Sequence, residues 1–297
     1  MKHGIVFCCA VFAAFSAAAQ AVPLIYDGFN YPLGEPLAGQ QSPDVGWAGA
    51  WDVNSATANA VVVAGLTFAG PRYDLFVSGN AVKLSAWQSE SLASRGVSAS
   101  VVGGDLWTGW LVNVDGVIAG NRVVESRVNL FEFGDFRASK LRTLIKSFFG
   151  TGPAVAYGIH EALGTPDTTQ PNTTYLLVSH FEDVNQYQGG PATLWMVSLA
   201  DFSAMDLADG VMSVADLEAH HSCKVVCDHE NEALNVGDFI QLELFSDINA
   251  TFDELRYGTT LADVVPLVAH TTAHNVHAVG GRIHLGAGSP AVRPSPD

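Results

Sequence analysis

The stretch LWTGWLVNV, residues 106–114, alternates between side chains suited to a protein core and side chains suited to its outside. In an extended strand, successive side chains point to opposite faces. One face would carry the apolar set Leu106, Trp110, Val112 and Val114. Trp107 and Asn113 would lie on the other face. This pattern predicts a β-strand with one side in a hydrophobic core.

Two further stretches repeat the alternation, VESRVNLF at residues 124–131 and DFIQLELF at residues 238–245. In both, apolar residues alternate with a polar set made of Glu125, Arg127, Asn129, Gln241 and Glu243. Short apolar runs broken by Gly, Pro, Asn and Asp recur along the chain, and sustained helical periodicity is almost absent. We expect strands at residues 61–63, 81–86, 97–101, 106–114, 123–133, 141–149, 174–182, 193–199, 238–245 and 250–257. The chain is therefore predicted to be all-β, a two-sheet antiparallel β-sandwich.

The first 21 residues, MKHGIVFCCAVFAAFSAAAQA, have a basic start, an apolar middle and a small-residue end. This composition is typical of a signal peptide, so we expect a secreted protein that is extracellular, periplasmic or on the cell surface. No later stretch is long and apolar enough to predict a membrane span. We expect one domain over residues 22–267, with an insertion at 201–237 and a flexible tail at 268–297.

The chain carries 30 acidic residues against 14 basic ones, a formal charge of −16. A field of that sign repels nucleic acid and anionic membranes, so we expect no nucleic-acid partner. Apolar residues make up 48% of the chain and charged residues 15%, which is the composition of a folded protein and not of an acidic disordered one.

Specific resemblance comes from both ends of the predicted domain. LIYDGFNYPLGEPLAGQQSPDVGWAGAW at residues 24–51 and ATFDELRYGTTLADVVP at 250–266 resemble the opening and closing segments of secreted planctomycete and verrucomicrobial proteins. TYLLVSHFEDVN at 174–185 and ATLWMVSL at 192–199 resemble their penultimate strand pair. Those proteins contain a concanavalin A-like, or laminin-G-like, jelly roll. The resemblance implies two antiparallel sheets with the first and last strands adjacent, and it implies no reaction.

A glycan-binding surface is the leading functional hypothesis. If the strands share a sheet, Trp107 could stack on a sugar ring while Arg127, Asn129 and Gln241 hydrogen-bond its hydroxyl groups. The partner would be a polysaccharide or a cell-surface glycan. Alternatively, Trp107 packs under a loop and the polar residues only solvate a sheet. A structural or adhesive protein that recognises another protein is a further possibility.

Laminarinase-like hydrolases share the jelly roll and place acids at alternate positions of one strand, so that two carboxyls meet in one cleft. Here Arg127 and Asn129 occupy the alternate positions after Glu125, and Glu132 and Asp135 would face opposite ways. We therefore expect a non-catalytic module. A glycan-active hydrolase is the alternative, in which loss of Glu125 or Glu243 would abolish turnover.

Calcium is a possible structural cofactor, because jelly rolls of this resemblance often hold one near the paired terminal strands. Asp27 and Asp253 would supply hard oxygen ligands. Alternatively, both acids end turns or pair with Arg256.

The stretch HHSCKVVCDHE, residues 220–230, concentrates potential metal ligands. Because export favours oxidation, we expect a disulfide between Cys223 and Cys227 that closes a surface loop. The alternative is zinc bound by both thiolates with His221 or His229. The histidines of the tail, 270, 274 and 277, suggest only incidental metal affinity.

Overall fold

The computed structural model describes most of the chain after residue 21. The described residues are 22–42, 44–53, 58–86, 91–98, 104–115, 122–129, 140–147, 151–157, 160–165, 168–184, 190–207, 209–228, 241–270, 276–279 and 282–285. The predicted signal peptide lies outside them, as do Glu132, Asp135, His229 and His274.

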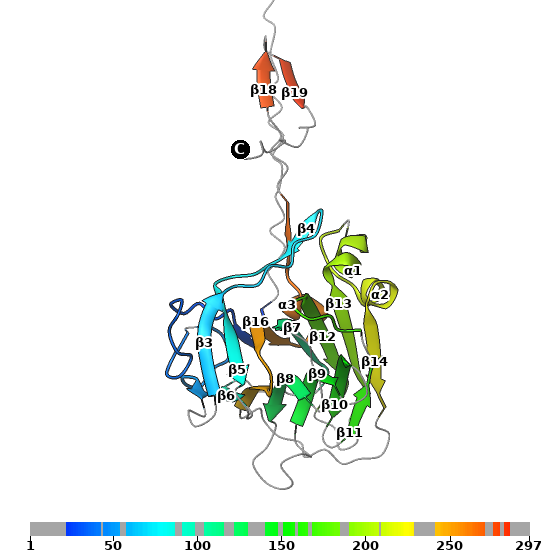
Figure 1. Ribbon diagram of the computed structural model, residues 1–297. Coiled ribbons are helices and arrows are strands. Elements are labelled where there is room, and N and C mark those ends of the chain that lie inside the picture. The colour runs from blue at the N-terminus through cyan, green and yellow to red at the C-terminus, as the bar shows by residue number, and fades with distance from the viewer. Residues whose placement is uncertain are drawn as a thin grey trace, which may run out of the picture.

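Two large antiparallel sheets form the body of the molecule (Figure 1). The first sheet has eight strands, in the order β14 (Cys223–Cys227), β13 (Ala192–Ser198), β12 (Thr174–Phe181), β7 (Leu106–Val114), β16 (Ala250–Gly258), β5 (Asn80–Ala86) and β3 (Ala58–Ala64), with β1 (Ile25–Asp27) also paired to β16. The second sheet has seven strands, in the order β11 (His160–Leu163), β10 (Thr151–Tyr157), β9 (Lys140–Ser147), β8 (Arg122–Asn129), β15 (Gln241–Ser246), β6 (Ser91–Gly96) and β2 (Asp52–Val53).

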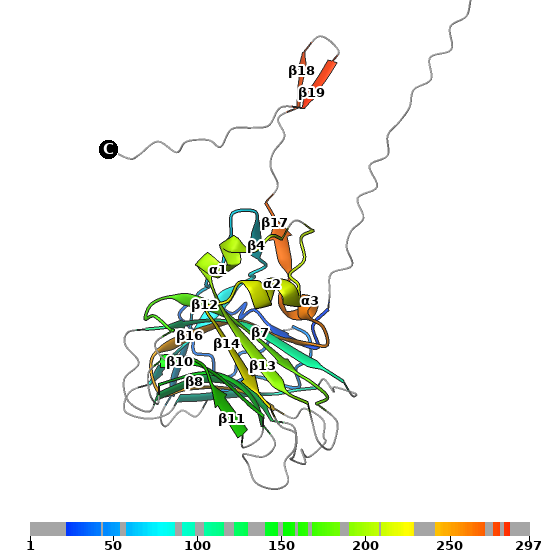
Figure 2. The same ribbon diagram turned by 90° about the vertical axis from the view of Figure 1, so that its right-hand side faces the viewer.

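The smaller elements lie outside these sheets. They are α1 (Leu199–Ala204), α2 (Val214–Ala219), α3 (Leu261–Val264), the pair β4 (Tyr73–Leu75) with β17 (Leu267–Ala269), and the pair β18 (Val276–Val279) with β19 (Arg282–Leu285). Figure 2 shows all three helices and the β4–β17 pair on the side of the first sheet that faces away from the second. Among the described residues, no helix is long and apolar enough to cross a bilayer.

The predicted all-β, two-sheet antiparallel sandwich is confirmed. The first and last strands of the sandwich are adjacent, because β1 pairs with β16 with Tyr26 opposite Arg256. The strand predicted at 106–114 has those bounds in the structure. The predicted insertion contains α2 and also β14, which is a full member of the first sheet. Residues 268 and 269, expected in the flexible tail, belong to β17 and pair with β4.

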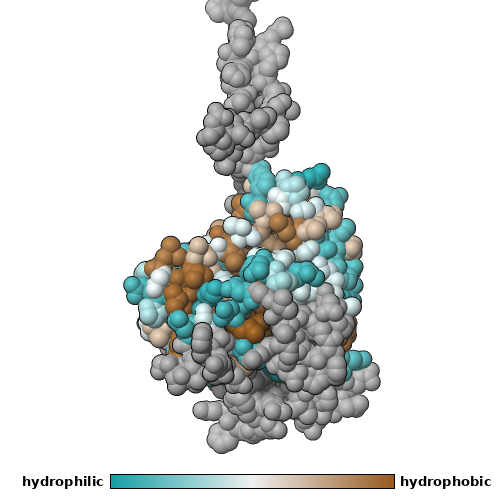
Figure 3. Space-filling model, viewed as in Figure 1, coloured by the Kyte–Doolittle hydropathy of each residue, from teal (hydrophilic) through white to brown (hydrophobic). Residues whose placement is uncertain are grey.

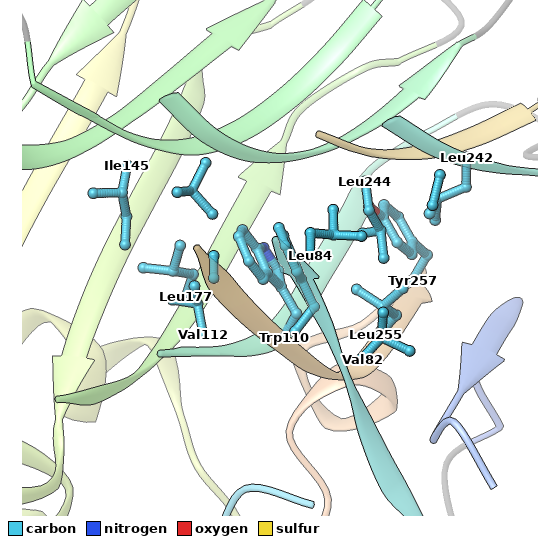
Figure 4. Close-up of a cluster of buried hydrophobic side chains, with 14 of the residues drawn as sticks. Val82, Leu84, Trp110, Val112, Ile145, Leu177, Leu242, Leu244, Leu255 and Tyr257 are labelled. Carbon is cyan, nitrogen blue, oxygen red and sulfur yellow. The ribbon is translucent and has the colours of Figure 1, made fainter. Parts of the chain in front are cut away.

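The core lies between the two sheets. Trp110 and Leu177 from the first sheet face Ile145 and Leu244 from the second (Figure 4). The indole of Trp110 stacks on Phe252 with ring centroids 5.4 Å apart. The predicted inward set of β7 is confirmed, since its four members, Leu106, Trp110, Val112 and Val114, are all buried in this core. Alternation therefore placed the inward face of β7 correctly.

A second apolar cluster covers the opposite face of the first sheet. Trp107, Leu111 and Trp195 from the sheet pack there with Phe202 of α1 and Val264 of α3. The first sheet is consequently buried on both faces over much of its area. The outward side of the second sheet is mixed, since it carries the buried acids Glu125 and Glu243 and also the fully buried Leu144 and Ala154.

A buried ion pair joins the two sheets near one end. Asp27 of β1 accepts hydrogen bonds through Oδ2 from Nη1 of Arg95 at 2.8 Å, from Tyr31 at 2.8 Å and from Trp51 at 2.9 Å. Its Oδ1 accepts from the backbone N–H of Phe29 at 2.8 Å. Both charged side chains are fully buried. Because Arg95 belongs to β6 of the second sheet, this network ties the N-terminal segment to both layers.

Replacing Asp27 with Asn should strongly destabilise the fold, because it leaves the Arg95 guanidinium buried without its counter-charge. Breaking one side of a buried pair typically costs about 3–5 kcal/mol. The free energy of unfolding from urea titration measures this. Lys83→Met is the matched control, because its pair with Asp115 is about one-third exposed and should contribute no more than about 1 kcal/mol. Equal losses in the two variants would contradict the role given to Asp27.

Candidate functional site

Three of the predicted ligand-binding residues come together in the second sheet. Strands β8 and β15 are neighbours, with Gln241 opposite Asn129 and Glu243 opposite Arg127. Arg127 is in turn opposite Arg142 of β9. The condition that these strands share a sheet therefore holds for β8 and β15, but not for β7, which belongs to the first sheet.

These positions belong to the side of the sheet that faces away from the core. Val124, Leu242 and Leu244 point into the core, so the residues that alternate with them point outward. We call this outward side the polar face. It is defined by the described side chains Ser94, Glu125, Arg142, Gln241 and Glu243, together with the strand positions of Arg127 and Asn129.

Charges of both signs are packed closely in the polar face. Glu125 is 2% exposed and Glu243 is 4% exposed, so water reaches neither carboxylate freely. Nη1 of Arg142 lies 3.7 Å from Oε2 of Glu125. Buried charges are costly unless they are paired, and Arg142 supplies such a partner for Glu125. Arg142 was missed from the sequence, although its alternation with Leu141 and Ile145 would have placed it here.

The two glutamates are diagonal neighbours. Glu125 is directly opposite Phe245 on β15, and Glu243 is two residues before Phe245. Diagonal positions on adjacent strands lie about 7–8 Å apart. A laminarinase-like site would carry its two acids on one strand, whereas the structure places Glu125 and Glu243 on two neighbouring strands.

Trp107 is not part of this surface. It belongs to β7 of the first sheet and is 7% exposed. Its indole stacks on His180 with centroids 4.1 Å apart and runs parallel to Trp195 at 6.0 Å. The predicted shared surface of Trp107 with Arg127, Asn129 and Gln241 is therefore wrong, because period-two alternation orients a side chain without specifying its sheet.

Asp27 does not fit a calcium site. Both of its oxygens accept hydrogen bonds from protein donors, and one of those donors is the Arg95 cation, which would repel a divalent ion. Burial raises the pKa of Asp27, while the hydrogen bonds from Trp51 and Tyr31 oppose that effect. The sequence could not reveal this pairing, because Arg95 is remote along the chain. Calcium binding by the protein stays a prediction.

Asp253 also lacks the setting of a calcium ligand. It lies at a β-bulge of β16, where Oδ2 accepts from the backbone N–H of Leu66 at 2.7 Å and Oδ1 from that of Glu254 at 2.8 Å. Glu254 adopts a φ of 53°, which is unusual for a residue other than glycine. Its carboxylate accepts from the backbone N–H of Ser78 at 2.6 Å and pairs with Arg256. The two acids thus bind both ends of residues 65–79, which we call the arm.

The cysteines do not form the predicted surface loop. Cys223 and Cys227 are the two ends of β14, and both point into the core at 4% exposed. Four residues of strand span about 13 Å, whereas a disulfide needs Cα atoms within about 7 Å. The disulfide prediction is therefore wrong, and the structure has no such bond.

The described residues also group no three His, Cys, Asp or Glu side chains as a metal site. Nδ1 of His221 lies 2.7 Å from the carbonyl oxygen of Leu217, in the turn that follows α2. In the tail, Nε2 of His270 lies 2.7 Å from Oδ1 of Asp74.

No protein-family model matches this sequence, and a search of curated proteins finds no relative. Among solved structures, the chain is similar to the globular domain of T. cruzi calreticulin, with a TM-score of 0.41, 9% identity, and 71% of this chain and 84% of that chain covered. It is also similar to the cellulose-induced protein Cip1, with a TM-score of 0.40, 10% identity, and 71% and 91% covered.

Lectin I-B4 from Griffonia simplicifolia matches with a TM-score of 0.34, 6% identity, and 67% and 92% covered. The scores and identities are low, so the fold assignment rests on the two sheets and no function is carried over.

The bulge of β16 should make stability depend on pH. Burial and the neighbouring Glu254 raise the pKa of Asp253 from 3.8 to about 8. The folded protein therefore keeps this proton where the unfolded chain has lost it. The stabilising contribution of protonated Asp253 is full below about pH 4 and is lost as the pH rises toward about 8.

In the variant Asp253→Asn this site no longer titrates. The free energy of unfolding of the variant should rise relative to the wild type between about pH 4 and pH 8 and then run parallel to it. Urea titrations across that range measure the difference. Asp115→Asn, which removes a partly exposed acid, should show no such trend. Parallel curves for wild type and Asp253→Asn throughout would contradict the shifted pKa.

Proposed function

We propose that this protein is a secreted, non-catalytic β-sandwich module that binds a neutral polysaccharide or cell-surface glycan through its polar face. The observation that carries the proposal is the register of β8 and β15, with Gln241 opposite Asn129 and Glu243 opposite Arg127. Three predicted ligand residues thereby occupy adjoining positions in the middle of one sheet.

The chemistry of these residues suits sugar hydroxyls, which both donate and accept hydrogen bonds. Carboxylates accept, guanidinium groups donate, and the amides of Gln241 and Asn129 do both. Sites on strands hold such groups more rigidly than sites on loops, which favours precise recognition. The formal charge of −16 disfavours a strongly anionic ligand. Secretion is part of the proposal because the first 21 residues have the composition of a signal peptide.

A glycan hydrolase is the second candidate, and the diagonal placement of Glu125 and Glu243 favours it specifically. Glycosidases need two carboxyl groups directed into the same cleft, and these two acids lie on the same side of neighbouring strands. In that mechanism one glutamic acid would protonate the leaving oxygen and the other would activate water.

The binding proposal is tested by retention of the secreted protein on insoluble cellulose, chitin, β-1,3-glucan, mannan and xylan. We expect retention on at least one of them, and a loss of about tenfold or more in the double variant Arg127→Ala/Gln241→Ala, because the planar groups that bind hydroxyls are gone. Lys224→Ala on β14, an exposed residue of the other sheet, is the matched control and should bind like the wild type. Unchanged retention of a folded double variant would disprove binding through the polar face.

Turnover separates the two candidates. A non-catalytic module should release no reducing sugar from the polysaccharide that retains it, even after prolonged incubation. Release of reducing ends would instead indicate a hydrolase. In that case Glu125→Gln and Glu243→Gln should each lower the rate of release by about a hundredfold or more. Circular dichroism and thermal unfolding of each variant control for loss of fold.

A further inference from the structure

A groove of about 510 Å³ opens far from the polar face, between the arm and the segment that begins with α1. Residues 70–73 form one wall and residues 202–207 form the other. We call it the arm groove. Both ribbon views place β4 of the arm beside α1, over the outer side of the first sheet (Figures 1 and 2). Its volume lies within the range of about 300–1,000 Å³ that is usual for small-molecule sites.

The walls of the groove are held in place by close packing. Gly70 lies so near Phe202 that an added Cβ would stand 2.9 Å from the phenylalanine ring. Gly210, with a φ of 75°, lies against the ring of Tyr73. Behind the other wall, α1 begins with a capping box in which Ser198 and Asp201 exchange hydrogen bonds. The groove is therefore preformed, which lowers the entropy that a ligand must lose on binding.

The lining combines an aromatic ring with polar groups. Tyr73 is half-buried, and the floor contains the buried side chains of Phe202 and Met205. Nη1 of Arg72 and Oδ1 of Asp206 lie 3.5 Å apart, and their side chains are 71% and 83% exposed. An ion pair that exposed contributes little to stability, so both groups can turn toward a ligand at small cost. Figure 3 shows hydrophobic and hydrophilic residues side by side at this end of the molecule.

We propose that the arm groove is a second binding site, independent of the polar face, and that it takes a short segment of a neutral saccharide. The ring of Tyr73 offers an apolar surface for the C–H face of a pyranose. Arg72 and Asp206 offer a planar donor and a planar acceptor for hydroxyl pairs. One cation and one anion leave the rim without net charge, which suits a neutral ligand better than an anionic or cationic one.

Calorimetric titration of the intact protein with cellotetraose, laminaritetraose, xylotetraose, mannotetraose and chitotetraose tests this inference. We expect at least one of them to bind. Ser203 is exposed on the groove wall, so Ser203→Trp should fill the groove and weaken that binding by about tenfold or more, whereas Ser203→Ala should leave it unchanged. Tyr73→Ala should weaken it similarly, whereas Tyr73→Phe keeps the ring and should retain most of the affinity.

The variant Gln241→Ala distinguishes binding at the arm groove from binding at the polar face, because it changes only the polar face. Binding that survives Gln241→Ala and is lost in Ser203→Trp supports the arm groove, even if retention through the polar face fails. Binding that survives Ser203→Trp overturns the inference and leaves the polar-face proposal standing. Failure of all five saccharides to bind the folded wild type also overturns it. Arg72→Ala and Asp206→Ala should also weaken saccharide binding. Both side chains are exposed, so a loss of affinity in these variants would not reflect a loss of fold, as it could in Tyr73→Ala.

Discussion

The salt bridge between Asp27 and Arg95 is the constraint on which the rest of the sandwich depends. It brings the first strand of one sheet against β6 of the other, with Tyr31 and Trp51 donating to the same carboxylate oxygen. A buried pair of this kind is tolerated only when its remaining hydrogen-bonding groups are satisfied. Arg95 meets that condition by donating from Nε to the carbonyl of Gly49 and from Nη2 to that of Ser42. The N-terminal segment is thus fixed by polar contacts as well as by apolar packing.

The two sheets differ in what covers their outward sides. The helices and the arm cover the outer side of that sheet, so the indole of Trp107 packs under Phe202 and its neighbours. The outward side of the second sheet instead carries Glu125, Arg142 and Glu243 among its central strands. The same outward side also carries the buried apolar cluster of Leu144 and Ala154, so charged and apolar side chains lie next to each other on it.

Period-two alternation predicted β7, β12, β13 and β16 closely, but it missed β6, β10, β11 and β14 and did not reveal which strands pair. The inward set of β7 could be read from residues 106–114, because a buried face imposes its own pattern on the sequence. The same pattern did not reveal that Trp107 and Arg127 lie in different sheets, since pairing depends on contacts between residues far apart in the chain. The pairing of Asp27 with Arg95 went unpredicted for the same reason.

The cysteines show a different limit of sequence reading. CKVVC has strand alternation, with its outer and middle residues buried and the others exposed. The neighbouring cysteines and histidines are also typical of disulfide or metal sites, so the same residues support two different interpretations. A short edge strand between polar segments carries a weak signal, so its role in the first sheet became evident only from its pairing with β13.

The arm links the buried charges of the bulge to the surface. Its base is bound by Asp253 through Leu66 and by Glu254 through Ser78, and its tip is paired with β17, where Leu75 lies opposite Leu267. Apolar contacts add to this, because Phe68 and Leu75 of the arm are buried in the second apolar cluster, where the ring of Phe68 lies 5.2 Å from that of Phe202. The strained φ of Glu254 is maintained by this arrangement, because the arm offers its carboxylate a backbone donor that an unbulged strand could not reach. The bulge of β16 therefore fixes the base of the arm, and the pairing of β4 with β17 fixes the strand that leads to the arm groove.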